Sequence, residues 1–244
     1  MRLKLIIPAR YQSRRLPGKP LVMLHGKSMI RRCWERCANA FPAQDIWVAT
    51  DDARILAHCQ SAGIQVLMTP EHCLTGTDRV ALAAREIPAD YYLSVQGDEP
   101  LIDPSDILAV RDAALSRPDW ILNGMCHIED ERDYWSLKIP KVVCRQDGRL
   151  LYMSRRPIPG GKTSTMTASS RQVCIYGLPP VALEAFIEAG VKTPLESIED
   201  IEILRFLELG HEVRMIELSA GPFSVDIPED VPEVERIILA RGLG

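Results

Sequence analysis

Several features that mark common protein classes are absent from this sequence. The 244-residue chain has no apolar run of membrane-spanning length, so we expect no membrane partner. Its formal net charge of −4 argues against a dedicated nucleic-acid-binding protein, which usually needs a basic face. The N-terminus passes from MRLK into a short apolar run and then into prolines and arginines, without the pattern of a signal or transit peptide. The sequence therefore predicts a cytoplasmic protein.

Cysteine chemistry is also sparse. The seven cysteines form no Cys-x-x-Cys pair and lie mostly in apolar surroundings, so we expect reduced, mostly buried thiols. The neighbours His72–Cys73 and Cys126–His127 lack the second spaced pair that a zinc site needs. No G-x-S-x-G serine elbow is present either, so a Ser-His-Asp hydrolase has no support.

Two familiar phosphate-binding motifs are incomplete. Gly26-Lys27-Ser28 matches the end of a Walker A loop, but Leu21 occupies the position of the required earlier glycine. No G-x-G-x-x-G follows the first apolar run, which argues against a Rossmann dinucleotide site. A doubly wound fold remains compatible with these absences, because a fold does not by itself imply one function.

What the sequence does contain is a regular alternation of strand-like and helix-like segments. Hydrophobic residues make up 46% and charged residues 25% of the chain, which are ordinary values for a globular protein. The pattern predicts strands at 3–7, 45–50, 65–68 and 91–95, and helices at 28–39, 53–62, 79–86 and 105–116. We interpret 75–79 as a polar turn, with Asp78 as the cap of the third helix. Such alternation predicts an α/β protein with a doubly wound, mainly parallel sheet.

The pattern changes at residues 123–177. Segments 138–145 and 149–154 flank an Asp-Gly bend and predict a β-hairpin. Residues 156–170 are rich in Pro, Gly, Ser and Thr, which predicts a mobile loop. We therefore interpret the chain as a single domain, 1–244, into which 123–177 are inserted as a β-rich sub-domain with a flexible lid.

The C-terminal third returns to the alternation. It predicts strands at 173–176 and 213–216 and helices at 180–189, 195–209 and 232–239. The helix predicted at 195–209 should point four apolar residues largely inward: Ile198, Ile201, Leu204 and Phe206.

Four cations follow the first predicted strand: Arg10, Arg14, Arg15 and Lys19. In open α/β sheets, ligands bind beyond the carboxyl ends of the strands. This loop therefore predicts a polyanionic ligand, most simply a triphosphate. The alternative is a solvated basic loop, since Arg and Lys are usually exposed.

An acidic turn, Asp98-Glu99, follows the strand predicted at 91–95. A carboxylate at a strand end, next to Gly97, suits a magnesium ion that carries phosphate oxygens. The alternative is an ordinary surface turn, because Gly-Asp is common turn chemistry. Together with the cationic loop, the turn predicts a Mg-nucleotide site.

Several motifs occur in the order found in one family. They are Arg10 with LPGKPL (16–21), TGTDR (75–79), VQGDEP (95–100), LYMSRRPIP (151–159), TPLESIEDIEILR (193–205) and SVDIPEDV (224–231). With these motifs the chain resembles the 3-deoxy-manno-octulosonate (Kdo) cytidylyltransferases, from Leu3 to about Ile237. LPGKPL with VQGDEP is specific, whereas TGTDR alone is weak.

The resemblance implies a nucleotidyltransferase fold and a reaction. CTP and a 2-keto-3-deoxy sugar acid would give a CMP-sugar and pyrophosphate, for lipopolysaccharide synthesis in bacteria. It also implies Mg²⁺ and a homodimer, with segment 123–177 carrying dimer contacts and part of the sugar site. The expected chemistry is positioning and charge neutralisation, because phosphoryl transfer leaves the protein little covalent work.

The resemblance also assigns roles to individual residues. Catalytic contacts to the triphosphate are implied for Arg10, Arg15 and Lys19, with Asp98 and Asp226 as metal ligands. The cytidine would lie among Pro8, Ala9, Arg10, Thr75, Gly76, Thr77 and Arg79, with Gln96 near the base or the sugar. Arg155 and Glu196 would lie around the sugar acid, whose carboxylate has Arg155, Arg156 and Arg171 as candidate partners.

Two positions depart from the family pattern. Gln172 stands where many Kdo enzymes have a histidine, and Ile203 replaces the glutamine of L-E-Q-L-R. Both lie in segments that the family uses around the sugar, so we hypothesise that they reshape the sugar pocket. The substrate would then be Kdo or a close analogue, with 8-amino-Kdo or another ulosonic acid as the alternative.

Two other classes of function remain open. A nucleotide-sugar glycosyltransferase could place a metal on Asp51-Asp52 or on the Gly97–Glu99 turn, although it would leave LPGKPL unexplained. A non-catalytic sugar-nucleotide sensor would be expected to have lost a metal carboxylate or the triphosphate lysine. Asp98, Asp226 and Lys19 are all present.

Overall fold

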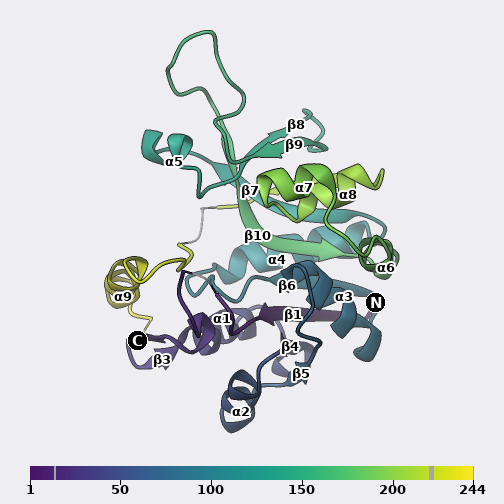
Figure 1. The fold of residues 1–244 in the computed structure, drawn as a ribbon, viewed down its shortest axis with the longest axis vertical. Helices are drawn as coiled ribbons and strands as arrows, with labels where there is room; N and C mark the ends of the chain where they lie inside the picture. Colours follow the sequence, from purple (N-terminus) through teal and green to yellow (C-terminus); the bar gives the residue numbers. More distant parts are fainter. Residues whose placement is uncertain (14, 220–222, 244) are drawn as a thin grey trace.

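A twisted sheet forms the centre of the computed structural model, which describes residues 1–13, 15–219 and 223–243 (Figure 1). Within those residues the sheet has nine strands, seven of them in the order β11-β7-β10-β6-β1-β4-β5. These seven are β1 (Leu3–Ala9), β4 (Ile46–Thr50), β5 (Val66–Met68), β6 (Tyr91–Val95), β7 (Ile121–His127), β10 (Ser170–Leu178) and β11 (Val213–Glu217). Off this path, β8 (Lys141–Cys144) pairs with β10 and with β9 (Leu150–Ser154). A separate pair joins β2 (Met23–Leu24) to β3 (Lys27–Ser28).

Along the seven-strand path most neighbours are parallel, as the alternation predicted. β1 is parallel to β4 and β6, β4 to β5, and β11 to β7. The exception is β10, which runs antiparallel to both β6 and β7 and carries an irregularity between Val173 and Tyr176. β10 also brings in the predicted hairpin, because β8 pairs with its first residues. The fold class predicted from the sequence is confirmed, including the hairpin.

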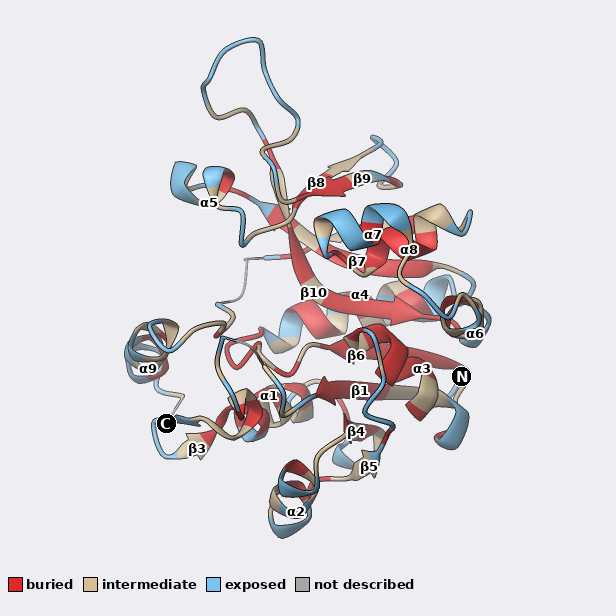
Figure 2. Ribbon diagram, in the orientation of Figure 1, coloured by how far each residue is buried: buried red, intermediate tan, exposed pale blue. Residues whose placement is uncertain are grey.

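Helices cover both faces of the sheet (Figure 2). They are α1 (Met29–Ala38), α2 (Ala53–Ser61), α3 (Gly76–Glu86), α4 (Pro104–Ser116), α5 (Glu131–Trp135), α6 (Pro180–Glu188), α7 (Pro194–Glu199), α8 (Ile203–Glu208) and α9 (Asp230–Ala240). Short 3₁₀ turns lie at Lys19–Leu21 and Ala43–Asp45.

Two apolar clusters form the main core, one on each face of the sheet. Leu5 and Ile7 of β1 belong to the cluster that includes residues of α1, α2 and α4. Ile6 between them belongs to the cluster that includes residues of α3, α6 and α8. This division follows from the strand geometry, since successive side chains point to opposite faces. The seven cysteines are free, and four of them are buried, as expected.

The third helix begins earlier than the sequence suggested. Thr75, not Asp78, is its N-cap: the Thr75 side chain accepts a hydrogen bond from the Asp78 backbone N–H. The predicted polar turn at 75–79 is therefore largely the first turn of α3. Threonine at this position satisfies one of the unpaired N–H groups that every helix start leaves.

The predicted helix at 195–209 is wrong as a continuous element. It is two short helices, α7 and α8, separated at Asp200, whose φ of 52° is in the left-handed region. Ile201, Leu204 and Phe206 are buried as expected, but Ile198 is 78% exposed. Apolar periodicity did not reveal the break, because the carbonyls of Glu199 and Asp200 bond to Arg155, a residue distant in sequence.

A buried ion cluster joins this helix pair to α3. The Arg205 side chain is fully buried and donates to Glu196 (Nε–Oε2 2.7 Å) and to Asp78 (Nη1–Oδ1 2.8 Å). Its guanidinium also lies 3.8 Å from the centre of the Phe186 ring. Removing one partner from a buried charge cluster leaves the others uncompensated, which costs more than the cluster itself contributes.

We therefore expect Arg205→Met to lower the free energy of unfolding by about 3–5 kcal/mol, because Glu196 and Asp78 would stay buried without a cation. Urea unfolding followed by circular dichroism would measure the change. Arg85→Met is the matched control: Arg85 also links α3 to another helix through Glu184, but at an exposed position, so little change is expected. An equal loss in the two variants would contradict the argument.

Candidate active site

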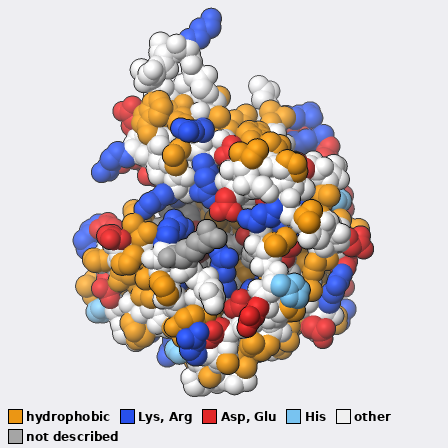
Figure 3. All heavy atoms as spheres, in the orientation of Figure 1, with side chains coloured by type: hydrophobic (Ala, Val, Ile, Leu, Met, Phe, Trp, Pro, Cys, Tyr) orange, Lys and Arg blue, Asp and Glu red, His pale blue; other side chains and the backbone are white. Residues whose placement is uncertain are grey.

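Three segments far apart in the sequence meet at Lys19. Its Nζ donates to Asp98 Oδ2 at 2.6 Å and to Asp226 Oδ1 at 3.0 Å. Arg15 reaches the same Asp226 oxygen at 2.9 Å. Asp98 follows β6 and Asp226 precedes α9, and their segments are also joined by the Val225 N–H, which donates to the Asp98 carbonyl. Lys and Arg side chains border a hollow in the middle of this face (Figure 3).

The opposite charges of this cluster shift the pKa values of Lys19 and Asp226 in the direction that favours their ionised forms. Burial works to lower the pKa of Lys19, but the carboxylates of Asp98 and Asp226 outweigh it, so the pKa is raised. Burial would raise the pKa of Asp226, but Lys19 and then Arg15 outweigh it, so this pKa is lowered. Lys19 is therefore cationic and Asp226 anionic at neutral pH.

Two glycines allow the backbone to bring these groups together. Gly18, which precedes Lys19, has a φ of 69°, and a Cβ there would lie 3.0 Å from the Tyr11 hydroxyl oxygen. A Cβ on Gly97 would lie 2.9 Å from the carbonyl oxygen of Pro8. The turn that carries Asp98 therefore packs directly on the end of β1, which only glycine permits.

Glu99 differs sharply from its neighbour Asp98. It is only 4% exposed, and its Oε2 has no hydrogen-bond partner among the described residues. Burial, followed by the negative charge of Asp98, raises the pKa of Glu99 well above its usual value. Asp98-Glu99 is therefore not an ordinary exposed surface turn.

The residues expected around cytidine lie along the ends of β1 and α3. Pro8 and Ala9 are the last residues of β1, and Arg10 follows them as an exposed side chain. Gln96 lies beside the first turn of α3, because a Cβ on Gly76 would be 3.1 Å from its Nε2. Arg79 is buried and donates to Asp51 at 2.6 Å and to Thr69. Arg14 lies outside the described residues.

Two of the residues expected around the sugar acid have internal partners instead. Glu196 is fully buried; it accepts from Arg205 through both oxygens and caps α7 through the Thr193 N–H. Arg155 donates from all three guanidinium nitrogens to backbone carbonyls, which belong to Glu199, Asp200, Leu137 and Lys138. Contact with a ligand would require either side chain to give up these bonds.

The two positions that depart from the family pattern differ in their surroundings. Gln172 is 7% exposed, and its Nε2 donates to Asn123 Oδ1 at 2.9 Å and to the Tyr176 hydroxyl at 3.3 Å. Ile203 is 1% exposed and belongs to the apolar cluster of α3, α6 and α8. Ile203 is therefore a packing residue, whereas Gln172 belongs to a polar group.

Sequence reasoning missed Glu202. Its carboxylate accepts hydrogen bonds from the Gly76 N–H (3.0 Å), the Thr77 N–H (2.8 Å) and the Thr77 hydroxyl. A signal was present, since Glu202 lies beside Ile203 in the IEILR motif, but nothing in the motif showed that it reaches residues more than 120 positions earlier.

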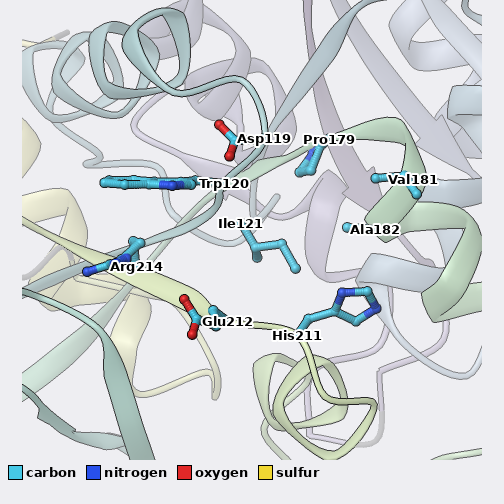
Figure 4. Close-up of a pocket in the computed structure, with 9 residues that line it drawn as sticks. All are labelled: Asp119, Trp120, Ile121, Pro179, Val181, Ala182, His211, Glu212 and Arg214. Atoms are coloured by element: carbon cyan, nitrogen blue, oxygen red, sulfur yellow. The ribbon is translucent and has the colours of Figure 1, made fainter.

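A separate cavity of about 230 Å³ lies at another part of the sheet. It is lined by the start of β7, the start of β11 and the connection from β10 to α6: Asp119, Trp120, Ile121, Pro179, Val181, Ala182, His211, Glu212 and Arg214 (Figure 4). None of the site residues predicted from the sequence lines it.

The donor set at Lys19 fits magnesium. Among the residues that the structure describes, no group of three or more His, Cys, Asp or Glu side chains could hold a metal ion. Mg²⁺ does not need such a cage, because it is usually bound by one or two carboxylates together with substrate phosphates and water. Asp98 and Asp226, which share one ammonium, are two carboxylates of this kind.

Comparisons with solved structures place the fold. A glucose-1-phosphate thymidylyltransferase from Bacillus anthracis aligns over 96% of this chain and 94% of its own, with a TM-score of 0.69 at 15% identity. A cytidylyltransferase from Leptospira borgpetersenii aligns over 100% and 96%, with a TM-score of 0.64 and again 15% identity. The fold is that of a nucleotidyltransferase.

Relatives of higher sequence identity show which kind of nucleotidyltransferase this chain resembles. Residues 5–215 match the family described as Cytidylyltransferase. The 3-deoxy-manno-octulosonate cytidylyltransferase of Myxococcus xanthus is 38% identical over 97% of this chain and 96% of the relative, and that of Escherichia coli is 33% identical over 98% and 96%. A structure of CMP:2-keto-3-deoxy-manno-octonic acid synthetase complexed with CTP covers 99% of this chain and 100% of its own, with a TM-score of 0.91 and 30% identity. The chain belongs to the 3-deoxy-manno-octulosonate cytidylyltransferase family, which confirms the resemblance read from the motifs.

The close approach at Gly97 can be tested directly. We expect Gly97→Ala to lower the free energy of unfolding by about 1–3 kcal/mol, because the new methyl group would overlap a backbone carbonyl that cannot move independently. Chemical denaturation would measure it. Gly160→Ala is the control, since nothing lies within 4 Å of a Cβ there. Unchanged stability of Gly97→Ala would show that the turn is free to shift.

Proposed function

We propose that this protein transfers the cytidylyl group of CTP to the anomeric hydroxyl of Kdo, giving CMP-Kdo and pyrophosphate for lipopolysaccharide synthesis. The observation that carries the proposal is the Lys19 cluster: one ammonium joins the LPGKPL, VQGDEP and SVDIPEDV segments of this family. A sensor that had lost catalysis would not be expected to keep all three groups in contact.

No helix among the described residues could cross a membrane.

Charge balance suggests how the triphosphate is held. Lys19 and Arg15 offset Asp98 and Asp226, so the cluster is close to neutral by itself. A triphosphate adds several negative charges, which Arg10 and a divalent cation would compensate. Mg²⁺ on Asp98 and Asp226 would neutralise phosphate charge and lower the pKa of a nearby hydroxyl. Lys19 and Arg15, freed from the carboxylates, would then hold the phosphates.

The cytidine would lie between the end of β1 and the start of α3. Pro8 and Ala9 would border the cytidine from β1 and Thr75–Thr77 from α3, where Gln96 lies next to Gly76. Arg79 would support it indirectly, since its guanidinium is held by Asp51 and Thr69. The sugar acid would lie on the side of β10 that carries Gln172. Because their polar groups are already bonded, Arg155 and Glu196 are not among the direct contacts that we propose.

We also propose that the protein acts as a homodimer through the 123–177 region. Exposed apolar side chains on and near the hairpin support this: Trp135 is 45%, Leu137 51% and Leu151 55% exposed. The segment between β9 and β10 projects from the body of the molecule (Figure 1) and would serve as the lid. We place the reaction in the cytoplasm, although a relative from Arabidopsis thaliana is named as mitochondrial.

The glycosyltransferase alternative loses one of its candidate metal sites. Asp51 is held by the buried Arg79, and Asp52 caps α2 while pairing with Arg54. Both carboxylates therefore have local structural partners.

The metal carboxylates give the first functional prediction. Asp98→Asn or Asp226→Asn should reduce pyrophosphate release from CTP and Kdo by about 10²–10³-fold, because removing one electrostatic contact to a phosphoryl-transfer site typically costs that much. Turnover would be measured in the presence of magnesium. Asp112→Asn, at an exposed pair with the adjacent Arg111, should leave turnover unchanged. Near-normal turnover in either site variant would remove that carboxylate from the metal site.

The choice of sugar acid gives the second functional prediction. Gln172→His should change the ratio of kcat/KM for Kdo over 8-amino-Kdo by about tenfold or more, since a pocket hydrogen bond to a substrate group can discriminate at least that strongly. The KM for CTP should stay constant. Ile203→Gln is unsuitable as a partner change, because it would bury an amide in an apolar cluster. If the ratio does not change, the departure at position 172 is neutral and the plain Kdo assignment stands.

A further inference from the structure

The carboxylate of Glu202 lies at the N-terminus of α3. It accepts one hydrogen bond through Oε1, from the Gly76 N–H, and two through Oε2, from the N–H and the hydroxyl of Thr77. These N–H groups belong to the first two residues of the helix, which have no partners within it. A negative charge at this end also interacts favourably with the helix dipole. Glu202 therefore satisfies the start of α3 from a segment 126 residues away in sequence.

A second side chain of the same segment holds the rest of the turn. Arg205, three residues after Glu202, donates to Asp78, and Asp78 in turn accepts the Thr75 hydroxyl at 2.6 Å. Residues three apart on a helix lie on the same face. The whole Thr75–Asp78 turn is thus fixed by two neighbouring side chains, that of Glu202, the N-cap of α8, and that of Arg205 within α8.

This turn is where the nucleotide and sugar sides of the proposed site meet. A Cβ on Gly76 would lie 3.1 Å from Gln96 Nε2 and 3.4 Å from Glu202 Oε1, so Gly76, Gln96 and Glu202 converge at one point. On its other side, the helix pair is fixed to the hairpin, because Glu199 accepts from the Ser154 hydroxyl and the Arg155 N–H.

We propose that Glu202 is a positioning residue for the nucleotide: it fixes the Thr75–Thr77 backbone in the conformation that receives the cytidine of CTP. The proposal rests on the proposed cytidylyltransferase function. It assigns Glu202 to the CTP side although the motif that contains it, IEILR, belongs to a segment used around the sugar. The geometry favours this assignment, because both carboxylate oxygens are already used by α3.

The test separates the two substrates. We would measure the Kd for CTP by calorimetry without sugar acid, and the KM for Kdo at saturating CTP. Glu202→Gln keeps the shape but removes the charge and one acceptor, so the Kd for CTP should rise about tenfold. The KM for Kdo should stay within about twofold, and the melting temperature should change little. Glu202→Asp, which keeps the charge, should restore part of the affinity.

A double-mutant cycle tests whether Glu202 acts through Thr77. Thr77→Val removes the hydroxyl that bonds to Glu202, so the double variant should bind CTP no more weakly than the weaker single variant. Glu184→Gln is the matched control, since Glu184 also bonds to α3, through Arg85 at the far end of the helix. It should leave both constants unchanged.

Three outcomes would overturn the proposal. A rise in the KM for Kdo with an unchanged Kd for CTP would show that Glu202 contacts the sugar acid directly. If the losses of CTP-binding free energy in the two single variants add up to that of the double variant, Thr77 and Glu202 act independently. A similar rise in the Kd for CTP and in the KM for Kdo, together with a lowered melting temperature, would show a merely structural role. Wild-type protein that binds no CTP would instead contradict the proposed function itself.

Discussion

The contact between one lysine and two carboxylates joins three distant segments of this protein at one edge of the sheet. Lys19, Asp98 and Asp226 come from the two ends and the middle of the chain, and their ion pairs join these three segments in the folded structure. Like charges such as Asp98 and Asp226 repel each other when they are brought together. Lys19 offsets that repulsion in this structure, and a divalent cation has the charge to take over the same task when phosphates compete for the lysine.

The start of α3 uses charge in a different way. Glu202, the N-cap of α8, and Arg205 within α8 both bond to this helix end, and Arg155 fixes the carbonyls at the break between α7 and α8. Their polar groups are consumed by internal bonds, so these residues act by holding backbone in place. Charged residues that a motif associates with a ligand can therefore have structural partners of their own.

Much of the fold could be predicted from the sequence because its signals are local. Short apolar runs predicted β1, β4 and β6, and the predicted starts of α1 and α2 agree with the N-caps that the structure shows, Ser28 and Asp52. The failures arose where a distant residue decides the local conformation. The break at Asp200 depends on Arg155, more than forty residues earlier, which binds carbonyls that a continuous helix would use itself.

The sequence by itself determined the family, the fold class and the residues available for the chemistry, because motif order and apolar periodicity are properties of the chain. Only the tertiary structure decided which side chains remain free for a ligand. Glu196 accepts from Arg205, Glu202 is bonded to α3, and the apolar Ile203 is packed in a cluster of the core. The physical reason is that a buried polar group is stabilised by a hydrogen-bond partner, and which partner is nearest depends on how the helices pack against the sheet.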